Sequence, residues 1–281
     1  MLLHYRTGWS LLAGLLFALT LTAQDVRGRV VDEAGAPVPY PTVYAPATAQ
    51  GTLGADDGTF TLTTKKLAPS DTLTVSCLGY ATQRLLVGEV TGTDTVRIVL
   101  PAAGLTLQTA EVTARRQRYR HKKLRLPGLL NATYSIVPGK SQARKEFGTI
   151  LRTRGERYRI DSVGLKLRSV DADSVLVEAN VYPLRFGQVG ASLLQQRSVR
   201  MVRADRIDRE ITFSLAGQGL ETDQDFVVAF RLLEVFGSGL GNLSMAAKAK
   251  DGFGLLRVVG GRWERSYFAL AANAYVSKPR E

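Results

Sequence analysis

The sequence predicts an all-β protein made of two successive β-sandwiches, and three observations lead to this prediction. Short runs rich in Val, Thr, Leu and aromatic residues recur along most of the 281 residues. Gly, Pro and Asp-Gly pairs separate these runs at close spacing. Several runs alternate apolar with polar residues, as half-buried strands do, and the first hundred residues show no helical periodicity. A chain of this length can form two modest domains, each with its own core.

The first 23 residues read as a secretory signal peptide. One basic residue, Arg6, precedes the apolar run Leu11–Leu21, which is too short to span a bilayer. Small residues end at Ala23, so we expect cleavage before Gln24, although Leu21 is larger than the usual residue two positions before the cut. We therefore expect an exported protein that is periplasmic, associated with the outer membrane or secreted. The alternative is an N-terminal anchor that is not cleaved.

Residues 24–101 are predicted to form the first sandwich. Leu73, Val75 and Cys77 alternate with polar residues, which places them on a buried face. Cys77 is the only cysteine, so it forms no internal disulfide and is interpreted as a buried, inert thiol. Asp57-Gly58 is interpreted as the turn of a β-hairpin. The predicted strands are Val26–Val31, Thr42–Ala45, Thr59–Thr63, Thr72–Cys77, Gln83–Val87 and Thr95–Leu100.

A motif in this region resembles the carboxypeptidase-like regulatory domain, a transthyretin-like sandwich common on secreted and outer-envelope proteins of Bacteroidota. Where that pattern usually has a small Ala this chain has Pro41, which predicts an edge position because Pro cannot donate to a ladder. The matching residues are Gly28, Val30, Gly35, Pro37, Pro39, Val43, Asp57-Gly58 followed by Phe60, and the pair Gly79-Tyr80.

The resemblance has two implications. In zinc carboxypeptidases this module is an accessory beside the catalytic domain, so it implies no chemistry of its own. The segment 105–114, LTLQTAEVTA, resembles the one that follows the module in TonB-dependent receptors. Too few residues follow it for a plug and a barrel of about 22 strands, so the module is expected here without them.

Residues 102–145 are predicted to form a basic linker. Residues 111–146 carry ten basic and two acidic residues, whereas residues 24–101 carry six basic and eight acidic ones. One interpretation is a solvated, extended connector whose charges repel. The other is a contact site for an anionic surface, and nucleic acid is not expected because the protein is exported and only Tyr119 could stack on a base. The candidate contact residues are Arg115, Arg116, Arg118, Arg120, Lys122, Lys123 and Arg125.

Residues 146–281 are predicted to form the second sandwich, in which Val175, Val177, Ala179 and Val181 alternate with Glu178 and its neighbours. The runs around Glu146-Phe147-Gly148, DSVGLKL, VLVEANVYPL, ITFSL and DFVVAF resemble a jelly-roll-like sandwich that follows the regulatory-like module in standalone Bacteroidota proteins. The predicted strands are Arg159–Arg168, Ser174–Tyr182, Glu210–Leu215, Asp225–Leu232, Gly254–Val259 and Ser266–Val276.

The sequence offers no recognisable catalytic or metal-binding constellation. His121 is the only histidine after the predicted signal, and HExxH, CxxC and P-loop motifs are absent from the sequence. The glycine-rich segment 237–241 is interpreted as a turn between strands. The alternating carboxylates Glu221, Asp223 and Asp225 are interpreted as a solvated loop, with a Ca²⁺ site as the alternative. We therefore predict no catalytic residue, no metal ligand and no cofactor.

Together these observations predict a non-enzymatic, exported envelope protein that acts as a binding or scaffolding module. The expected partner is an envelope glycan, an anionic lipid or another envelope protein, and no oligomeric state is predicted. Two alternatives stay open: a small outer-membrane β-barrel, and a glycan-active or peptide-active enzyme that uses acidic residues which the sequence does not pair.

Overall fold

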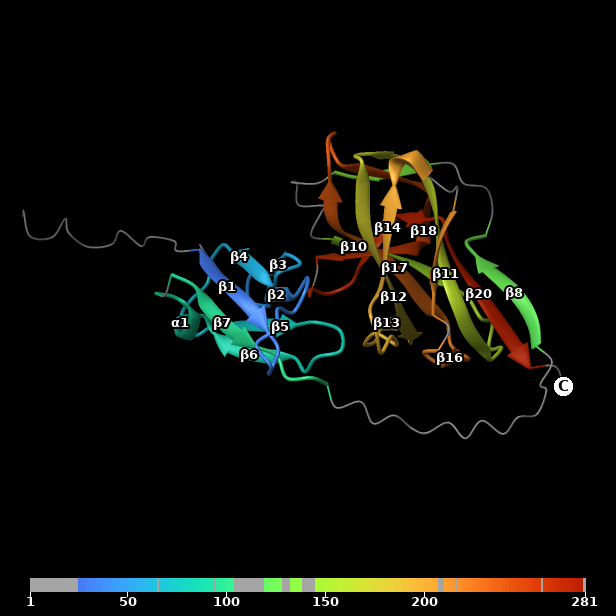
Figure 1. Cartoon of the computed structure of the whole chain (residues 1–281). Helices are drawn as coiled ribbons and strands as arrows, with labels where there is room; N and C mark the ends of the chain where they lie inside the picture. Colours follow the sequence, from blue (N-terminus) through green and yellow to red (C-terminus); the bar gives the residue numbers. More distant parts are fainter. Residues whose placement is uncertain are drawn as a thin grey trace, which may run out of the picture.

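A computed structural model describes residues 25–64, 66–92, 94–103, 119–127, 132–137, 145–206, 210–215, 217–258 and 260–279. These residues form two β-rich domains that lie side by side (Figure 1). Within them, helix is limited to α1 (Val87–Val90) and a single 3-10 turn (Ala204–Arg206), so the predicted all-β class is confirmed. The predicted signal peptide lies outside the described residues.

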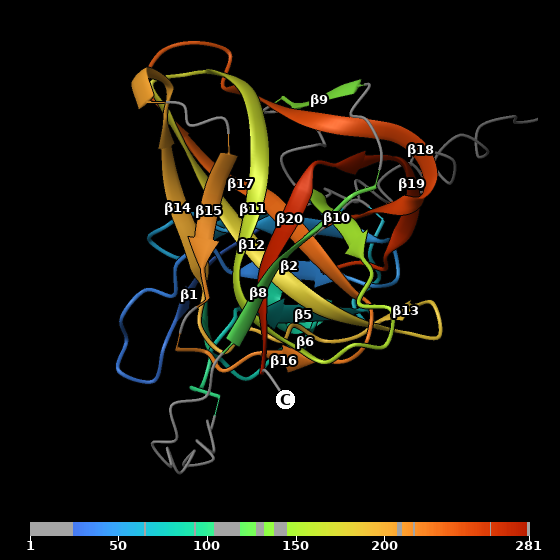
Figure 2. The ribbon, with the colours of Figure 1, turned by 90° about the vertical axis from the view of Figure 1, so that its right-hand side faces the viewer.

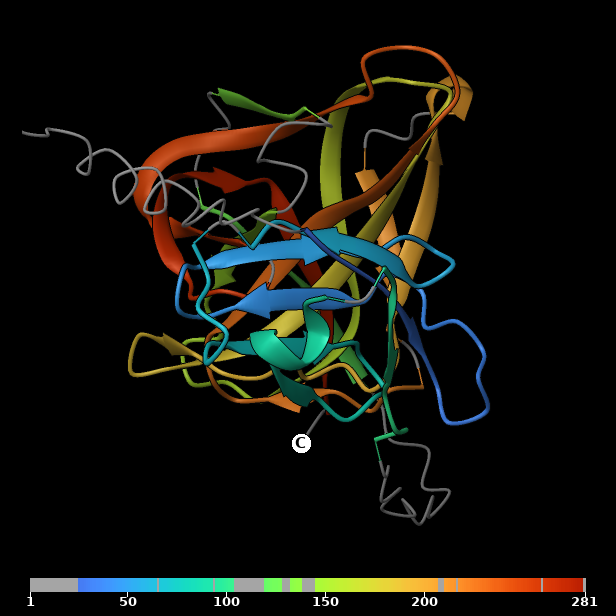
Figure 3. The ribbon, with the colours of Figure 1, turned by 90° about the vertical axis from the view of Figure 1, so that its left-hand side faces the viewer.

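The first domain is a sandwich of two small sheets, with strand orders β4-β1-β7 and β3-β2-β5-β6. Its core lies between them and includes Val30, Val43, Leu73 and Leu100, none of which has measurable exposure. Figure 3 shows this domain in front of the second one. The strands are β1 (Val26–Val31), β2 (Thr42–Ala45), β3 (Gln50–Leu53), β4 (Thr59–Leu62), β5 (Thr72–Ser76), β6 (Gln83–Leu86) and β7 (Val96–Val99).

The Asp57-Gly58 turn is real, but the hairpin predicted around it is wrong. The strand before it, β3, pairs with β2, and the strand after it, β4, pairs with β1 in the other sheet. Gly58 adopts a φ of 81°. The Oδ1 atom of Asp57 accepts a hydrogen bond from the Thr59 amide at 2.9 Å. The turn therefore carries the chain from one sheet to the other, which local turn chemistry cannot reveal.

The edge position predicted from Pro41 is also wrong. Pro41 directly precedes β2, which pairs with β3 on one side and β5 on the other. The carbonyl of Pro41 accepts a hydrogen bond from the Gly54 amide at 2.7 Å. Because a proline before the first strand residue removes no ladder donor, it is compatible with an interior strand.

The second domain is a two-layer sandwich. One layer holds β14, β12, β17, β10 and β18, with β9 and β19 beside β18; the other holds β15, β11, β20 and β8. Strand β11 belongs to both layers. Its first part pairs with β15 and β20, and its last part, from Leu167 on, pairs with β18, with a register shift between Leu167 and Ser169. The strands are β8 (Tyr119–Arg125), β9 (Ala132–Ile136), β10 (Lys145–Leu151), β11 (Tyr158–Asp171), β12 (Ser174–Arg185), β13 (Gln188–Val189), β14 (Ser198–Arg203), β15 (Glu210–Ser214), β16 (Glu221–Thr222), β17 (Phe226–Phe236), β18 (Asn242–Val258), β19 (Glu264–Leu270) and β20 (Ala272–Pro279).

The core of this domain lies between the two layers, as the alternating pattern predicts. Val175, Val177, Ala179 and Val181 of β12 are fully buried. The predicted strand 266–276 is interrupted at Ala271, where the chain leaves β18 and joins β11 as β20. The glycine-rich segment 237–241 links β17 to β18, so its interpretation as a turn is confirmed.

The segment predicted as a basic linker contains two strands of the second domain. Tyr119–Arg125 forms β8 and pairs with β20, and Ala132–Ile136 forms β9 and pairs with β18. Leu124 is the only buried residue of β8, so this strand lacks the apolar alternation by which strands are recognised. Charged residues are typical of edge strands, because they discourage pairing with another chain.

The two domains meet at a cluster of buried polar side chains. Arg197 donates from Nη1 to the Pro39 carbonyl at 2.5 Å, and Arg231 donates to Thr42 Oγ1 at 3.3 Å. Both guanidinium groups also contact Glu178, whose side chain is only 2% exposed. Glu178, Arg197 and Arg231 form what we call the interdomain ion cluster.

Cys77 packs against the core of the first domain, as predicted, but it is only half-buried because it also lies at this junction. It follows β5, is half-buried, and its Sγ lies 3.6 Å from the Pro39 carbonyl and 4.0 Å from Nη1 of Arg197. Burial, the largest influence, raises the pKa of the thiol. A thiol with a raised pKa forms less of the reactive thiolate.

We expect Arg197→Ala to make Cys77 react faster with a thiol reagent under native conditions. The substitution removes the side chain that covers the sulfur and one contact between the domains. The labelling rate of the native protein measures this, and Arg203→Ala, at an exposed ion pair with Asp205, serves as the control. Equal rates for the wild type and both variants would contradict the described junction.

Candidate functional site

The predicted contact residues lie on an edge strand that faces away from the first domain. β8 ends the main strand order of the second domain, beside β20, and Figures 1 and 2 show both on the side opposite the first domain. Arg120, Lys122, Lys123 and Arg125 lie on β8 and are exposed. Arg115, Arg116 and Arg118 lie outside the described residues.

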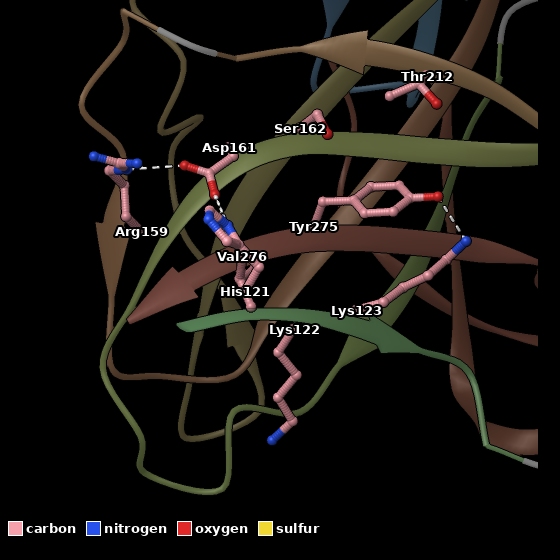
Figure 4. A pocket seen from close by; sticks show the side chains of 9 residues that line it. All are labelled: His121, Lys122, Lys123, Arg159, Asp161, Ser162, Thr212, Tyr275 and Val276. Carbon is pink, nitrogen blue, oxygen red and sulfur yellow. Dashed lines mark hydrogen bonds and ion pairs between the residues drawn. The ribbon is translucent and has the colours of Figure 1, made fainter. Parts of the chain in front are cut away.

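A shallow hollow of about 590 Å³ opens between β8, β20 and β11. Tyr275 of β20 lies opposite Lys123 of β8 and opposite Ser162 of β11 in the strand register. The side chains of Lys123, Tyr275 and Ser162 therefore lie on the same, outer face of the sheet. The side chain of Lys122 points to the other side of β8 (Figure 4). The result is a polar sheet face with an exposed basic edge.

Lys123, Tyr275 and Glu210 form a closed hydrogen-bonded triangle. Lys123 Nζ donates to the Tyr275 hydroxyl at 2.7 Å and to both Glu210 oxygens at 3.0 Å, and the hydroxyl donates to Glu210 at 2.7 Å. Burial alone would favour the neutral amine, but the hydrogen bonds to Tyr275 and Glu210 outweigh it and raise the pKa of Lys123. The positive charge of Lys123 is therefore already paired with the Glu210 carboxylate within the protein.

Asp161 organises the other end of the hollow. It sits at a register shift between Ile160 and Ser162, where β11 has one residue more than β20, and such bulges redirect side chains. Arg159 Nε donates to Asp161 Oδ1 at 2.8 Å, and His121 Nδ1 lies 3.9 Å from Oδ2 (Figure 4). The hydrogen bond to Asp161 raises the pKa of Arg159, whose guanidinium also lies over the ring of Tyr119 at 4.5 Å.

Two of the predicted contact residues form no direct contact with an opposite charge. Lys122 donates to the Tyr158 hydroxyl at 2.9 Å, and that hydroxyl donates to Glu156. By contrast, neither Arg120 nor Arg125 makes a side-chain hydrogen bond or an ion pair with another residue that the structure describes. Arg120 acts on the Glu156 carboxylate only at longer range, so the two arginines carry the positive charge of β8 that has no direct partner.

The contact between His121 and Asp161 joins residues 40 positions apart and could not be read from the sequence. Ser277 Oγ donates to Asp161 at 3.1 Å and not to the imidazole. No described hydroxyl group is hydrogen-bonded to His121, whose side chain is 75% exposed. The hydrogen bond between nucleophile and base that defines a catalytic triad is therefore not formed here.

Two of the three carboxylates considered for Ca²⁺, those of Glu221 and Asp225, accept hydrogen bonds within the protein. Glu221 accepts a hydrogen bond from Arg157 Nη2 at 2.6 Å, and Asp225 Oδ1 accepts one from the Thr153 amide at 3.0 Å. Asp223 contributes its backbone carbonyl to Thr153 Oγ1. In the described part of the chain, no three His, Cys, Asp or Glu side chains are gathered so that they could hold one metal ion.

Comparison with known proteins supports the resemblance found in the first domain. Residues 26–113 match the family model described as CarboxypepD_reg-like domain, which confirms that resemblance for this part of the chain. No curated protein sequence matches the chain. None of the helices among the described residues has the length and apolar character needed to cross a membrane.

Several solved structures show weak similarity to the chain. The cysteine protease and lectin-like domains of Cwp84 from Clostridium difficile share 12% identity, over 49% of this chain and 33% of that one, with a TM-score of 0.37. The VP2 subviral particle of infectious bursal disease virus shares 14%, over 91% and 64%, with a TM-score of 0.29. Carbohydrate-binding modules of the β-sandwich superfamily share 10%, over 75% and 84%, with a TM-score of 0.20. The chain thus spans less than two thirds of the length of the first two structures, and all three TM-scores are below 0.5.

Proposed function

We propose that this protein is a non-enzymatic, exported module of a bacterial envelope that binds an anionic surface through β8. The single observation that carries the proposal is the exposed edge strand, on which Arg120 and Arg125 form no hydrogen bond or ion pair with another described residue. An edge strand is accessible along its length, and guanidinium groups bind phosphate and carboxylate oxygens in a forked geometry.

Two further observations support this proposal. The basic run continues before β8 with Arg115, Arg116 and Arg118, which extends the positive charge along the chain. The first domain matches the model of the regulatory-like module. The sequence resemblance to envelope proteins of Bacteroidota and to TonB-dependent receptors motivates a periplasmic or outer-membrane-associated location. The docked first domain leaves the β8 side of the second domain open to a partner (Figure 2).

The double variant Arg120→Gln/Arg125→Gln is expected to bind vesicles of phosphatidylglycerol and phosphatidylcholine about 30-fold more weakly than the wild type. A basic side chain near an anionic surface contributes about 1 kcal/mol, and two such contributions correspond to that factor. Co-sedimentation measures the affinity, with pure phosphatidylcholine vesicles as the neutral surface. A parallel series on polygalacturonate distinguishes lipid phosphates from glycan carboxylates.

The matched control is Arg27→Gln/Arg84→Gln, which removes the same charge from exposed positions of the first domain. This variant should bind as the wild type does. Equal weakening by both double variants would show that net charge and not β8 governs binding, and equal binding by all three proteins would overturn the proposed contact.

A further inference from the structure

A second cavity lies in the second domain, away from β8, beside the layer that contains β10, β12 and β18. It has a volume of about 810 Å³ and is bordered by β10, β12, β13, β18 and the segment that leads into β19. This size falls within the range of sites for small molecules. Gly261 and Arg262 also line a neighbouring cavity that Tyr44 and Pro46 of the first domain help to form. The larger cavity thus adjoins the junction between the domains, a common place for ligand sites.

The inner wall of this cavity is apolar. Ile150, Leu184, Val189, Leu255 and Trp263 line it, and all five belong to a small apolar cluster separate from the main core. Ile150, Leu184, Val189 and Trp263 are only partly buried, so apolar surface remains exposed inside the recess. A recess of this kind favours the flat or apolar part of a ligand.

Arginine supplies nearly all the charge around this recess. Arg152, Arg257, Arg262 and Arg265 line it, against a single lining carboxylate, that of Asp225. A concave site lined by one sign of charge focuses the electrostatic potential and attracts counter-charged ligands. The Asp225 carboxylate is already engaged by the Thr153 amide, so it does little to balance the guanidinium groups.

The four arginines have two different roles. Arg257 donates to Glu146 at 2.8 Å and to the Tyr182 hydroxyl at 2.7 Å, and its guanidinium lies 4.5 Å from the Trp263 ring centroid. It is therefore a fixed part of the wall. Arg152, Arg262 and Arg265 are exposed, and none of them forms an ion pair with another residue in the described ranges. These three guanidinium groups are available to a ligand.

We propose that this cavity binds a small ligand that carries a carboxylate or phosphate group on a ring. Arg262 and Arg265 would hold the oxygens of the anionic group by forked, charge-assisted hydrogen bonds, which is the geometry that guanidinium groups favour. The ring of the ligand would lie against the apolar wall formed by Leu184, Leu255 and Trp263. This site is independent of the β8 edge, because no residue is shared between them.

Intrinsic fluorescence offers a direct readout of this cavity. The sequence contains two tryptophans, Trp9 and Trp263. In a Trp9→Phe chain, Trp263 is the single tryptophan, so a fluorescence change on titration reports on the cavity wall. The probes are glucuronate and glucose 1-phosphate, with glucose as the neutral control, and the two anionic probes separate carboxylate from phosphate recognition.

A saturable change with at least one anionic sugar and none with glucose is expected. Adding Arg262→Gln/Arg265→Gln should weaken that binding at least about tenfold, the usual scale for lost hydrogen bonds to charged groups. The β8 variant Arg120→Gln/Arg125→Gln and the first-domain variant Arg27→Gln/Arg84→Gln should leave it unchanged. Thermal melting checks that each variant stays folded.

Two outcomes would overturn the proposal. One is the absence of a saturable response to either anionic sugar. The other is binding that the cavity variant leaves intact, or that glucose reproduces. Neither outcome would affect the vesicle experiment on β8, because that contact uses different arginines on a different edge of the domain.

Discussion

Replacing Glu178 with alanine is expected to destabilise the protein by about 3–5 kcal/mol. Glu178 is 2% exposed, and its carboxylate contacts Arg197 Nε at 2.7 Å and Arg231 Nε. The side chains of these arginines are only 15% and 12% exposed, so the variant leaves two largely buried guanidinium groups without their hydrogen-bonded carboxylate. Urea unfolding at neutral pH measures the loss of free energy.

The matched control is Glu221→Ala, which breaks an exposed pair with Arg157. Exposed ion pairs typically contribute about 0–1 kcal/mol, so this variant should remain close to the wild type. A loss below about 1 kcal/mol for Glu178→Ala would show that the interdomain ion cluster does not hold the domains as described.

The pH dependence of unfolding checks the same cluster independently. Burial favours the neutral form of Glu178, but the guanidinium groups of Arg231 and Arg197 outweigh it and hold the pKa below 4.5. A depressed folded-state pKa contributes stability that is complete above the unfolded pKa and lost as pH falls through the folded value. The wild type should therefore lose this contribution below about pH 4.5, and Glu178→Ala should lack it.

Phe230→Ala is expected to cost about 3–5 kcal/mol of folding free energy. Phe230 lies near the middle of β17, is 1% exposed, and its ring centroid is 5.7 Å from that of Phe213 on β15. The pair connects the two layers of the second domain, so removing one ring leaves a cavity between them. Urea unfolding again measures the effect.

Phe186→Ala provides the control for this core substitution, because Phe186 is fully exposed between β12 and β13. Surface substitutions usually change stability by no more than about 0.5 kcal/mol. A cost for Phe230→Ala as small as that of Phe186→Ala would contradict the packing between the layers.

The local fold could be predicted where strands alternate regularly or sit between strong turn signals. β1 and β2 begin and end at the predicted residues, and β12 buries the predicted face. β8 was missed because an edge strand with one buried residue looks like a solvated linker. Edge strands need little apolar surface, so periodicity cannot separate the two cases.

Contacts between distant segments account for most of the remaining differences. Glu178 lies on the predicted outer face of β12, but the first domain and two arginines cover that face. Cys77 follows the predicted alternation and nevertheless lies at the junction of the domains. Both positions depend on how the domains dock, which the pattern of a single strand does not encode.

The candidate site was predictable in its charge but not in its geometry. The basic run predicts Arg120 and Arg125 as contact residues. Lys123 belongs to the same run, but its ammonium is hydrogen-bonded to Glu210 and Tyr275, which lie far away in the sequence. The arginine-lined cavity has no sequence signature, because its arginines come from separate strands and loops. Only the fold brings such scattered cations together.

The salt dependence of vesicle binding by the full chain tests whether β8 binds an anionic surface. If β8 binds an anionic surface through its charges, the affinity for phosphatidylglycerol-containing vesicles should fall steeply as salt rises. The reason is that the Debye length shortens from about 10 Å at 0.1 M to about 3 Å at 1 M. An affinity that stays constant over this range, or that is equal for pure phosphatidylcholine vesicles, would show that β8 does not bind an anionic surface through its charges.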